Sequence, residues 1–116
     1  FEGLKGTPES RKEYLAMTDD WKAGLLDRCV AGGETPNEMQ RRQKQGLEKL
    51  LARTEEKNVL IAMHGRAMRS FLCLLTDTPL HRMDEFKHSN LCMYKLAYDG
   101  SAFSILESNC TKHLWI

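Results

Sequence analysis

The order of apolar and polar positions predicts two short helices at the start of the chain. Thr-Pro-Glu at positions 7–9 combines an N-cap residue, a proline at the first helical position and an early acidic residue. A helix is therefore expected to run to about Met17. Thr-Asp-Asp at positions 18–20 repeats the start signal, and the apolar residues that follow indicate a second short helix. This second helix is expected to stop by Gly32-Gly33.

The clearest helix start follows at Thr35. Pro36 occupies the first helical position, and Glu38 completes a Thr-x-x-Glu capping box. The helix is expected to run to about Thr54 with one side toward a core, and Gly46 on that side indicates the close approach of another element. The predicted core-facing stripe consists of Met39, Gln43, Gly46, Leu47, Leu50 and Leu51.

A short apolar run, Val59–Met63, interrupts the helical pattern. Because helices flank it on both sides, it is predicted to be a central parallel strand covered on both faces. A helix is expected from about Arg66 to Leu75, ending at Asp-Thr-Pro, positions 77–79. Nearer the C-terminus, the apolar segments 91–98 and 102–106 flank an Asp-Gly pair, which predicts a β-hairpin.

Together these elements indicate an α/β fold. We expect part of a three-layer α/β/α sandwich with a mostly parallel central sheet and a C-terminal β-hairpin, in one partial domain spanning residues 1–116. One buried strand and one hairpin make a thin sheet for so many helices. N-terminal strands are therefore expected to be missing from a chain that starts at Phe1, or else another chain supplies them, as in a homo-oligomer.

Composition narrows the classes of function. The formal net charge is +1 and neither charge sign forms a block, so neither nucleic acid nor an anionic membrane is expected as a partner. No apolar run approaches the roughly 20 residues that span a bilayer, and no signal peptide is recognisable. The four cysteines are widely spaced without a C-x-x-C pair. We therefore expect a reduced, cytoplasmic protein with no structural zinc site.

His64 is the leading candidate for chemistry. It lies between the predicted strand and the next helix, where Gly65 permits a tight turn and where ligands of open α/β sheets bind. The free N–H groups and dipole of a helix N-terminus suit an anion such as phosphate. A lone histidine in a turn more often has a structural role, so both interpretations stand on the residues alone. The segment 87–90, which includes His88, is a candidate edge of the same cleft.

Other kinds of site fit less well. A Ser-His-Asp hydrolase is disfavoured because the chain has no G-x-S-x-G motif and His64 itself occupies the turn where the nucleophile would lie. His81, His88 and His113, each taken alone, fit a surface or capping role better than a ligand role. A His/Cys metal cluster has no supporting spacing.

Four stretches, in order along the chain, carry a resemblance to a known family. They are FEGLKGTPE at the start, GGETPNEMQRR before the long helix, VLIAMHGRAMRSFLCLL around His64, and HSNLCMYKLAYDGSAFSILESNCTKHL near the end. In this order they resemble the C-terminal portion of the histidine phosphatase superfamily, the phosphoglycerate-mutase-like enzymes. The resemblance spans nearly all 116 residues.

The resemblance implies a phosphohistidine mechanism in which His64 is the second histidine, in contact with the phosphoryl oxygens. In the family, a first histidine in an R-H-G motif attacks the phosphoryl group, two arginines clamp it, and an acidic residue protonates the leaving oxygen. The chain contains no R-H-G motif, so these groups are expected to lie before Phe1. The family needs no metal, and no cofactor is expected.

The resemblance also points to four residues for substrate or phosphate binding, each with an alternative. Arg66 either adds positive charge to the pocket or points to solvent. Glu34, which matches the acidic residue of a G-G-E-S segment, is either a substrate ligand or a carboxylate beside a capped helix. Glu2 is a residue at the edge of the cleft or a structural one. The candidate binding residues are Gly65, Arg66, Glu34 and Glu2.

The expected function is hydrolysis of a small phosphorylated metabolite, or mutase-like phosphoryl transfer, through phosphohistidine. A phosphatase is favoured because dedicated mutases carry longer insertions around the cleft. The 116 residues alone are expected to be inactive. The alternative is a non-catalytic module derived from the same family, which binds phosphate or another anion or interacts with another protein.

Overall fold

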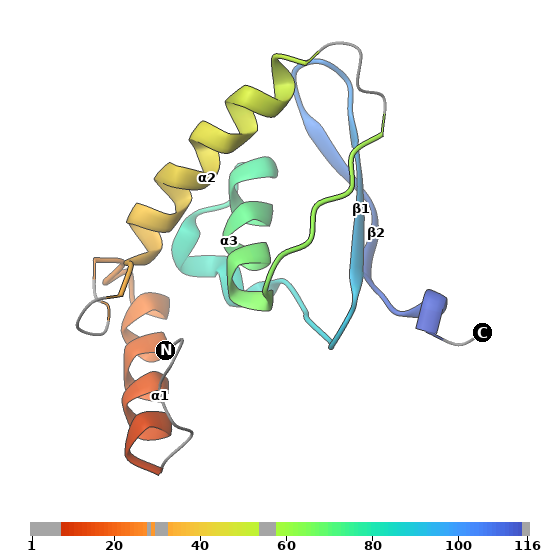
Figure 1. Cartoon of the computed structure of the whole chain (residues 1–116). Helices are drawn as coiled ribbons and strands as arrows, with labels where there is room; N and C mark the ends of the chain where they lie inside the picture. The colour runs from red at the N-terminus through yellow and green to blue at the C-terminus, as the bar shows by residue number, and fades with distance from the viewer. Residues whose placement is uncertain (1–7, 28, 30–32, 54–57, 115–116) are drawn as a thin grey trace.

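The structure is a computed structural model that describes residues 8–27, 29, 33–53 and 58–114. Within these ranges α1, α2 and α3 lie to one side of a two-stranded hairpin, as Figure 1 shows. The helices are α1 (Pro8–Lys22), α2 (Pro36–Leu51), α3 (Gly65–Leu75) and the 3-10 helices η1 (Leu80–Glu85) and η2 (Lys112–Leu114). The strands are β1 (Met93–Tyr98) and β2 (Phe103–Cys110). The expected combination of helices with a C-terminal hairpin is confirmed.

The first helix is longer than the sequence pattern indicates. α1 continues through the Thr-Asp-Asp stretch that we interpreted as a new start, because Thr18 is buried and its hydroxyl donates to the carbonyl of Leu15 at 3.0 Å. The helix then ends at Gly24, whose φ of 95° is left-handed. The N–H of Gly24 donates to Trp21 O at 3.0 Å and that of Leu25 to Asp20 O at 2.9 Å, which is a Schellman cap.

The second helix begins as predicted and packs differently from the prediction. Thr35 and Glu38 form both bonds of the capping box, at 3.1 Å and 3.2 Å. Gln43 donates to the carbonyl of Ala67 at 2.8 Å and accepts from the hydroxyl of Ser70 at 2.9 Å, so α2 meets α3 through amides. The expectation of a close approach at Gly46 is wrong, because a Cβ there meets nothing within 4 Å.

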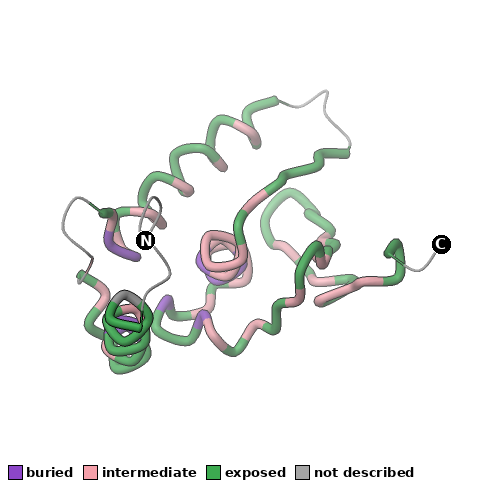
Figure 2. The backbone as a smooth tube through the Cα atoms, turned by 60° about the horizontal axis from the view of Figure 1, so that its bottom comes forward, coloured by how far each residue is buried: buried purple, intermediate pink, exposed green. Residues whose placement is uncertain are grey.

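The predicted strand Val59–Met63 is wrong for this structure. Residues 58–63 have no regular secondary structure, and the side chain of Leu60 is 90% exposed. The segment leads into the start of α3, and the tube in Figure 2 shows it mostly in the colour of exposed residues. A strand exists only when a neighbouring strand satisfies its backbone groups, and in the described ranges β1 and β2 pair with each other.

The C-terminal hairpin is confirmed, with an antiparallel pairing that joins Tyr98 to Phe103 and Met93 to Cys110. The carboxylate of Asp99 accepts from the N–H groups of Ala102 at 2.8 Å and Ser101 at 2.9 Å. These bonds hold the pKa of the Asp99 carboxyl below its usual value and fix the connection between the strands.

The core of the described residues is small and lies where α1, α3 and η1 meet. Its members are Met17, Trp21, Cys73, Leu80 and Met83, with Leu26 and Phe86 packed against them. Figure 2 marks buried segments on these same elements. The hairpin and most of α2 lie outside this cluster. Apolar burial in these ranges therefore holds together chiefly α1, α3 and η1.

A group of charged side chains borders the core; we call Asp84, Lys22, Arg66 and Arg69 the Asp84 cluster. The carboxylate of Asp84, on η1, forms ion pairs with Arg66 and with Arg69, the latter at 3.2 Å, and lies 3.8 Å from Lys22 Nζ. The side chains of Asp84, Arg66 and Arg69 are only 20–24% exposed. One partly buried carboxylate therefore faces three cations from two other elements.

Arg66 extends this cluster to the aromatic residues of α1. Its Nη2 donates to the hydroxyl of Tyr14 at 3.0 Å. Its guanidinium carbon lies 6.0 Å from the ring centre of Tyr14 and 5.8 Å from that of Trp21, within the range of cation–π attraction. Arg66 thus connects α3 with both α1 and η1.

We expect Asp84→Asn to lower the free energy of unfolding by about 1–3 kcal/mol, because three cations would then face one another without a compensating charge. Chemical denaturation monitored by circular dichroism measures the change. Glu85→Gln is the matched control at the adjacent position, where the carboxylate is exposed and pairs with Arg82 at 2.6 Å. Equal loss of stability in the two variants would contradict the role given to Asp84.

Cys73 is expected to resist thiol reagents in the folded protein. Its side chain is buried, and burial, together with the nearby charge of Glu85, raises the pKa of its thiol to about 11. Since the thiolate is the nucleophile, only about one Cys73 thiol in ten thousand is reactive at pH 7. Iodoacetamide labelling followed by peptide mass spectrometry should find Cys73 modified last among the four cysteines, and equal labelling of all four before unfolding would refute this.

Candidate functional site

His64 occupies the N-cap of α3. Its backbone is extended, with φ −73° and ψ 155°, and its carbonyl accepts the first helical bond from the N–H of Met68 at 2.8 Å. Its side chain is exposed and makes no capping bond to the helix. The imidazole is therefore accessible beside the positive end of an eleven-residue helix.

A second histidine lies against the first residue of this helix. A Cβ placed on Gly65 would lie 2.8 Å from both Cε1 and Nε2 of His88, and 3.0 Å from its Cδ2. The backbone of Gly65 has no left-handed φ, and a larger residue there would have to displace the exposed imidazole of His88. The predicted segment 87–90 does border the start of α3.

The loop that carries His88 is held by three hydrogen bonds. The hydroxyl of Tyr94 donates to the carbonyl of Lys87, and the N–H of Cys92 donates to the carbonyl of Ser89 at 3.0 Å. A ring nitrogen of His113, on η2, bonds the carbonyl of Leu91 at 2.8 Å. These bonds join the loop to itself, to β1 through Tyr94 and to η2 through His113.

Among the predicted binding residues, Gly65 lies with His64 at the helix start, whereas the side chain of Arg66 takes another direction. Its guanidinium belongs to the Asp84 cluster, with Tyr14 as a further partner. Binding of phosphate by this guanidinium stays a prediction, and it requires the side chain to leave Asp84. The sequence contained no sign of this ion pair, because the two residues are 18 positions apart.

The two predicted acidic residues do not join His64. Glu34 precedes the capped start of α2, and its carboxylate accepts two bonds from Arg42, at 2.8 Å and 3.1 Å. This placement corresponds to the carboxylate beside a capped helix that the sequence left open; a role in substrate binding stays untested. Glu2 lies outside the described residues.

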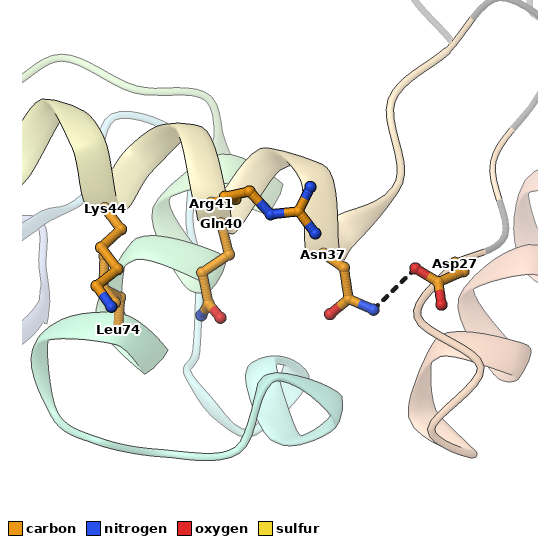
Figure 3. Close-up of a pocket in the computed structure, with 6 residues that line it drawn as sticks. All are labelled: Asp27, Asn37, Gln40, Arg41, Lys44 and Leu74. Atoms are coloured by element: carbon orange, nitrogen blue, oxygen red, sulfur yellow. Dashed lines mark hydrogen bonds between the residues drawn. The ribbon is translucent and has the colours of Figure 1, made fainter.

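An open hollow of about 400 Å³ lies beside α2 and contains none of the predicted site residues. In Figure 3, Asn37 and Asp27 point toward each other across one end, joined by a hydrogen bond of 3.0 Å. The remaining lining residues are Gln40, Arg41, Lys44 and Leu74. The candidate site at α3 is therefore a surface feature separate from this hollow.

No group of three or more His, Cys, Asp or Glu side chains is placed to hold a metal ion in the described ranges. None of the helices described is both long enough and apolar enough to cross a membrane.

A comparison with family models places this geometry in a known context. The model described as histidine phosphatase superfamily (branch 1) matches residues 1–111, nearly the whole chain. The chain belongs to the histidine phosphatase superfamily. Searches of curated proteins and of solved structures found no match. Membership in this superfamily agrees with the order of motifs along the sequence.

Gly65→Ala is expected to displace the imidazole of His88, because the added methyl group would overlap the ring. The Cε1–H and Cδ2–H NMR signals of His88 should then shift, while those of His81 on η1 stay in place. Gly46→Ala is the control: its methyl group meets nothing, so all histidine signals should persist and stability should rise by about 0.5–1 kcal/mol. An unchanged His88 spectrum in Gly65→Ala would contradict the contact.

Proposed function

We propose that this member of the histidine phosphatase superfamily hydrolyses a small phosphomonoester through a phosphohistidine intermediate, with His64 as the second, phosphate-contacting histidine. The observation that carries the proposal is the exposed imidazole of His64 at the N-cap of α3, in a chain that belongs to this superfamily. A phosphatase is preferred to a mutase because the chain is compact.

The chemistry of the helix start supports this role. In phosphoryl transfer, the nucleophile attacks phosphorus while the bond to the leaving oxygen breaks, and charge spreads over the non-bridging oxygens. Donors already in place around those oxygens lower the barrier because they do not need to reorganise. The imidazole N–H of His64 and the backbone N–H groups of the first turn of α3 are such donors. Gly65 leaves this approach free of a side chain.

The nucleophile is proposed to come from outside these 116 residues, since the chain contains no R-H-G motif. The 116-residue chain by itself is then inactive toward phosphomonoesters. The phosphate-clamping arginines and the acid that protonates the leaving oxygen belong to the same missing set. Turnover of p-nitrophenyl phosphate at an enzyme-like rate by the isolated chain would show that this assignment of the nucleophile is wrong.

The finer expectation for the fold belongs to the same proposal. Residues 58–63 expose Val59, Leu60 and Ile61 by 47–90%, although their sequence is apolar. We propose that this segment becomes a strand of a three-layer α/β/α sandwich when a neighbouring strand is present. Its apolar side chains favour such a buried position. The exposed side chains would then be covered and the backbone groups paired.

The absence of an R-H-G motif favours one alternative function. A module without the nucleophile can still bind phosphate at the start of α3, as an anion sensor or as part of an assembly. Mass spectrometry after brief incubation with a phosphomonoester separates the two possibilities. A phosphohistidine on the intact protein supports the enzyme, whereas phosphate binding without any phosphorylated residue supports the module.

In the intact, active protein, His64→Ala is expected to lower kcat for p-nitrophenyl phosphate by about 10²–10³-fold, because a donor to the charge of the transition state is lost. Steady-state kinetics measures this change. His81→Ala, at an exposed position on η1, is the matched control and should leave kcat unchanged. Full activity in His64→Ala would remove His64 from the mechanism.

A further inference from the structure

We propose that His88 is a second imidazole ligand for the phosphate group bound at the start of α3. The inference rests on the proposed function of that site and adds to it a residue from a different element. In this arrangement His64 and His88 border the same helix turn, and a ring N–H of each donates to the bound anion.

The contact with Gly65 is the first observation that carries the inference. The imidazole approaches the first residue of α3 so closely that a methyl group on Gly65 would lie 2.8 Å from two of its ring atoms. The N–H groups of a first helical turn have no partner within the helix, and no side-chain cap is formed by His64. An anion bound there would therefore lie within reach of the ring.

The second observation is that the position of His88 is fixed by its loop. Hydrogen bonds hold the carbonyls of Lys87, Ser89 and Leu91, one on either side of His88 and one further along. Leu91 adopts a left-handed φ of 59°, a conformation that a residue other than glycine keeps only when its surroundings enforce it. The backbone that presents the imidazole is thus already ordered.

The third observation is accessibility. His64 and His88 are both exposed, so neither ring has to leave a buried site to meet a ligand. Each imidazole keeps at least one N–H donor in either protonation state. By contrast, the guanidinium of the nearest arginine, Arg66, is held by Asp84 and Tyr14. Imidazoles are therefore the side chains best placed to meet an anion at this turn.

The first experiment titrates the intact protein with inorganic phosphate and follows binding by calorimetry and by the ring signals of the histidines. We expect the His88 signals to shift with the same dissociation constant as those of His64. His88→Ala should weaken phosphate binding by about tenfold, the effect of one lost hydrogen bond to a charged group. His88→Gln keeps a hydrogen-bond donor and should lose less affinity for phosphate than His88→Ala. His81→Ala should bind phosphate with the affinity of the wild type.

The second experiment separates binding from damage to the site, using the active protein. If His88 binds the substrate phosphate equally in the ground and transition states, His88→Ala raises KM for p-nitrophenyl phosphate by about tenfold and leaves kcat nearly unchanged. If His88 only supports the start of α3, its loss disturbs His64 and lowers kcat. A fall in kcat with unchanged KM would overturn the inference.

A double variant tests the contact itself. Gly65→Ala displaces the imidazole of His88, so this variant alone should weaken phosphate binding. In a protein that already carries His88→Ala, adding Gly65→Ala should weaken phosphate binding little further. Strict additivity of the two changes would count against a shared cause.

The outcomes also separate this inference from the proposed function. Binding that depends on His64 but is unaffected by His88→Ala overturns the role of His88 and leaves the phosphatase proposal standing. Failure of the wild type to bind phosphate, or binding indifferent to His64→Ala, overturns both.

Discussion

The attraction between the Asp84 carboxylate and the two arginines of α3 is the interaction on which the arrangement of the helices depends most. The apolar cluster where α1, α3 and η1 meet has five buried members, so it gives limited cohesion by itself. The Asp84 cluster adds directed contacts at the same place, because Arg66 reaches η1, Tyr14 and the ring of Trp21. Both arginines lie in the first part of α3, the part that also presents His64.

Local signals explain which parts of this structure could be predicted from the sequence. The capping box of α2 involves residues three positions apart, and the Asp-Gly pair defines the hairpin connection within four residues, so both were visible as short motifs. Thr18 carried the same type of signal and was misleading. A threonine can satisfy its hydroxyl within a helix by donating to a carbonyl of the preceding turn, and its burial against the core favours the helical conformation.

The parts that could not be predicted depend on residues distant in the sequence. The polar interface of α2 with α3 depends on Gln43 and Ser70. These residues are 27 positions apart, and no repeat of apolar positions in the sequence relates them. The contact of His88 with Gly65 needs the path of the whole loop before β1, although the segment itself could be suspected as a cleft edge. The apolar run at 58–63 shows the reverse case: its composition is that of a buried strand, yet composition cannot form a strand without a neighbour. Without a neighbouring strand, the backbone of this segment stays unpaired and its apolar side chains stay exposed.

The two arginine contacts also constrain how an anion can be recognised at α3. As long as Arg66 holds Asp84, its charge is largely balanced within the Asp84 cluster, and moving it to a phosphate would leave Asp84 with fewer partners beside the core. The backbone N–H groups of the first turn of α3 are not needed to balance the charge of Asp84, and neither are the exposed rings of His64 and His88. Recognition through these groups leaves the helix packing intact when the ligand enters or leaves. In the proposed binding mode, Arg66 stabilises the fold, while His64 at the N-cap of α3 and His88 in the loop before β1 meet the ligand.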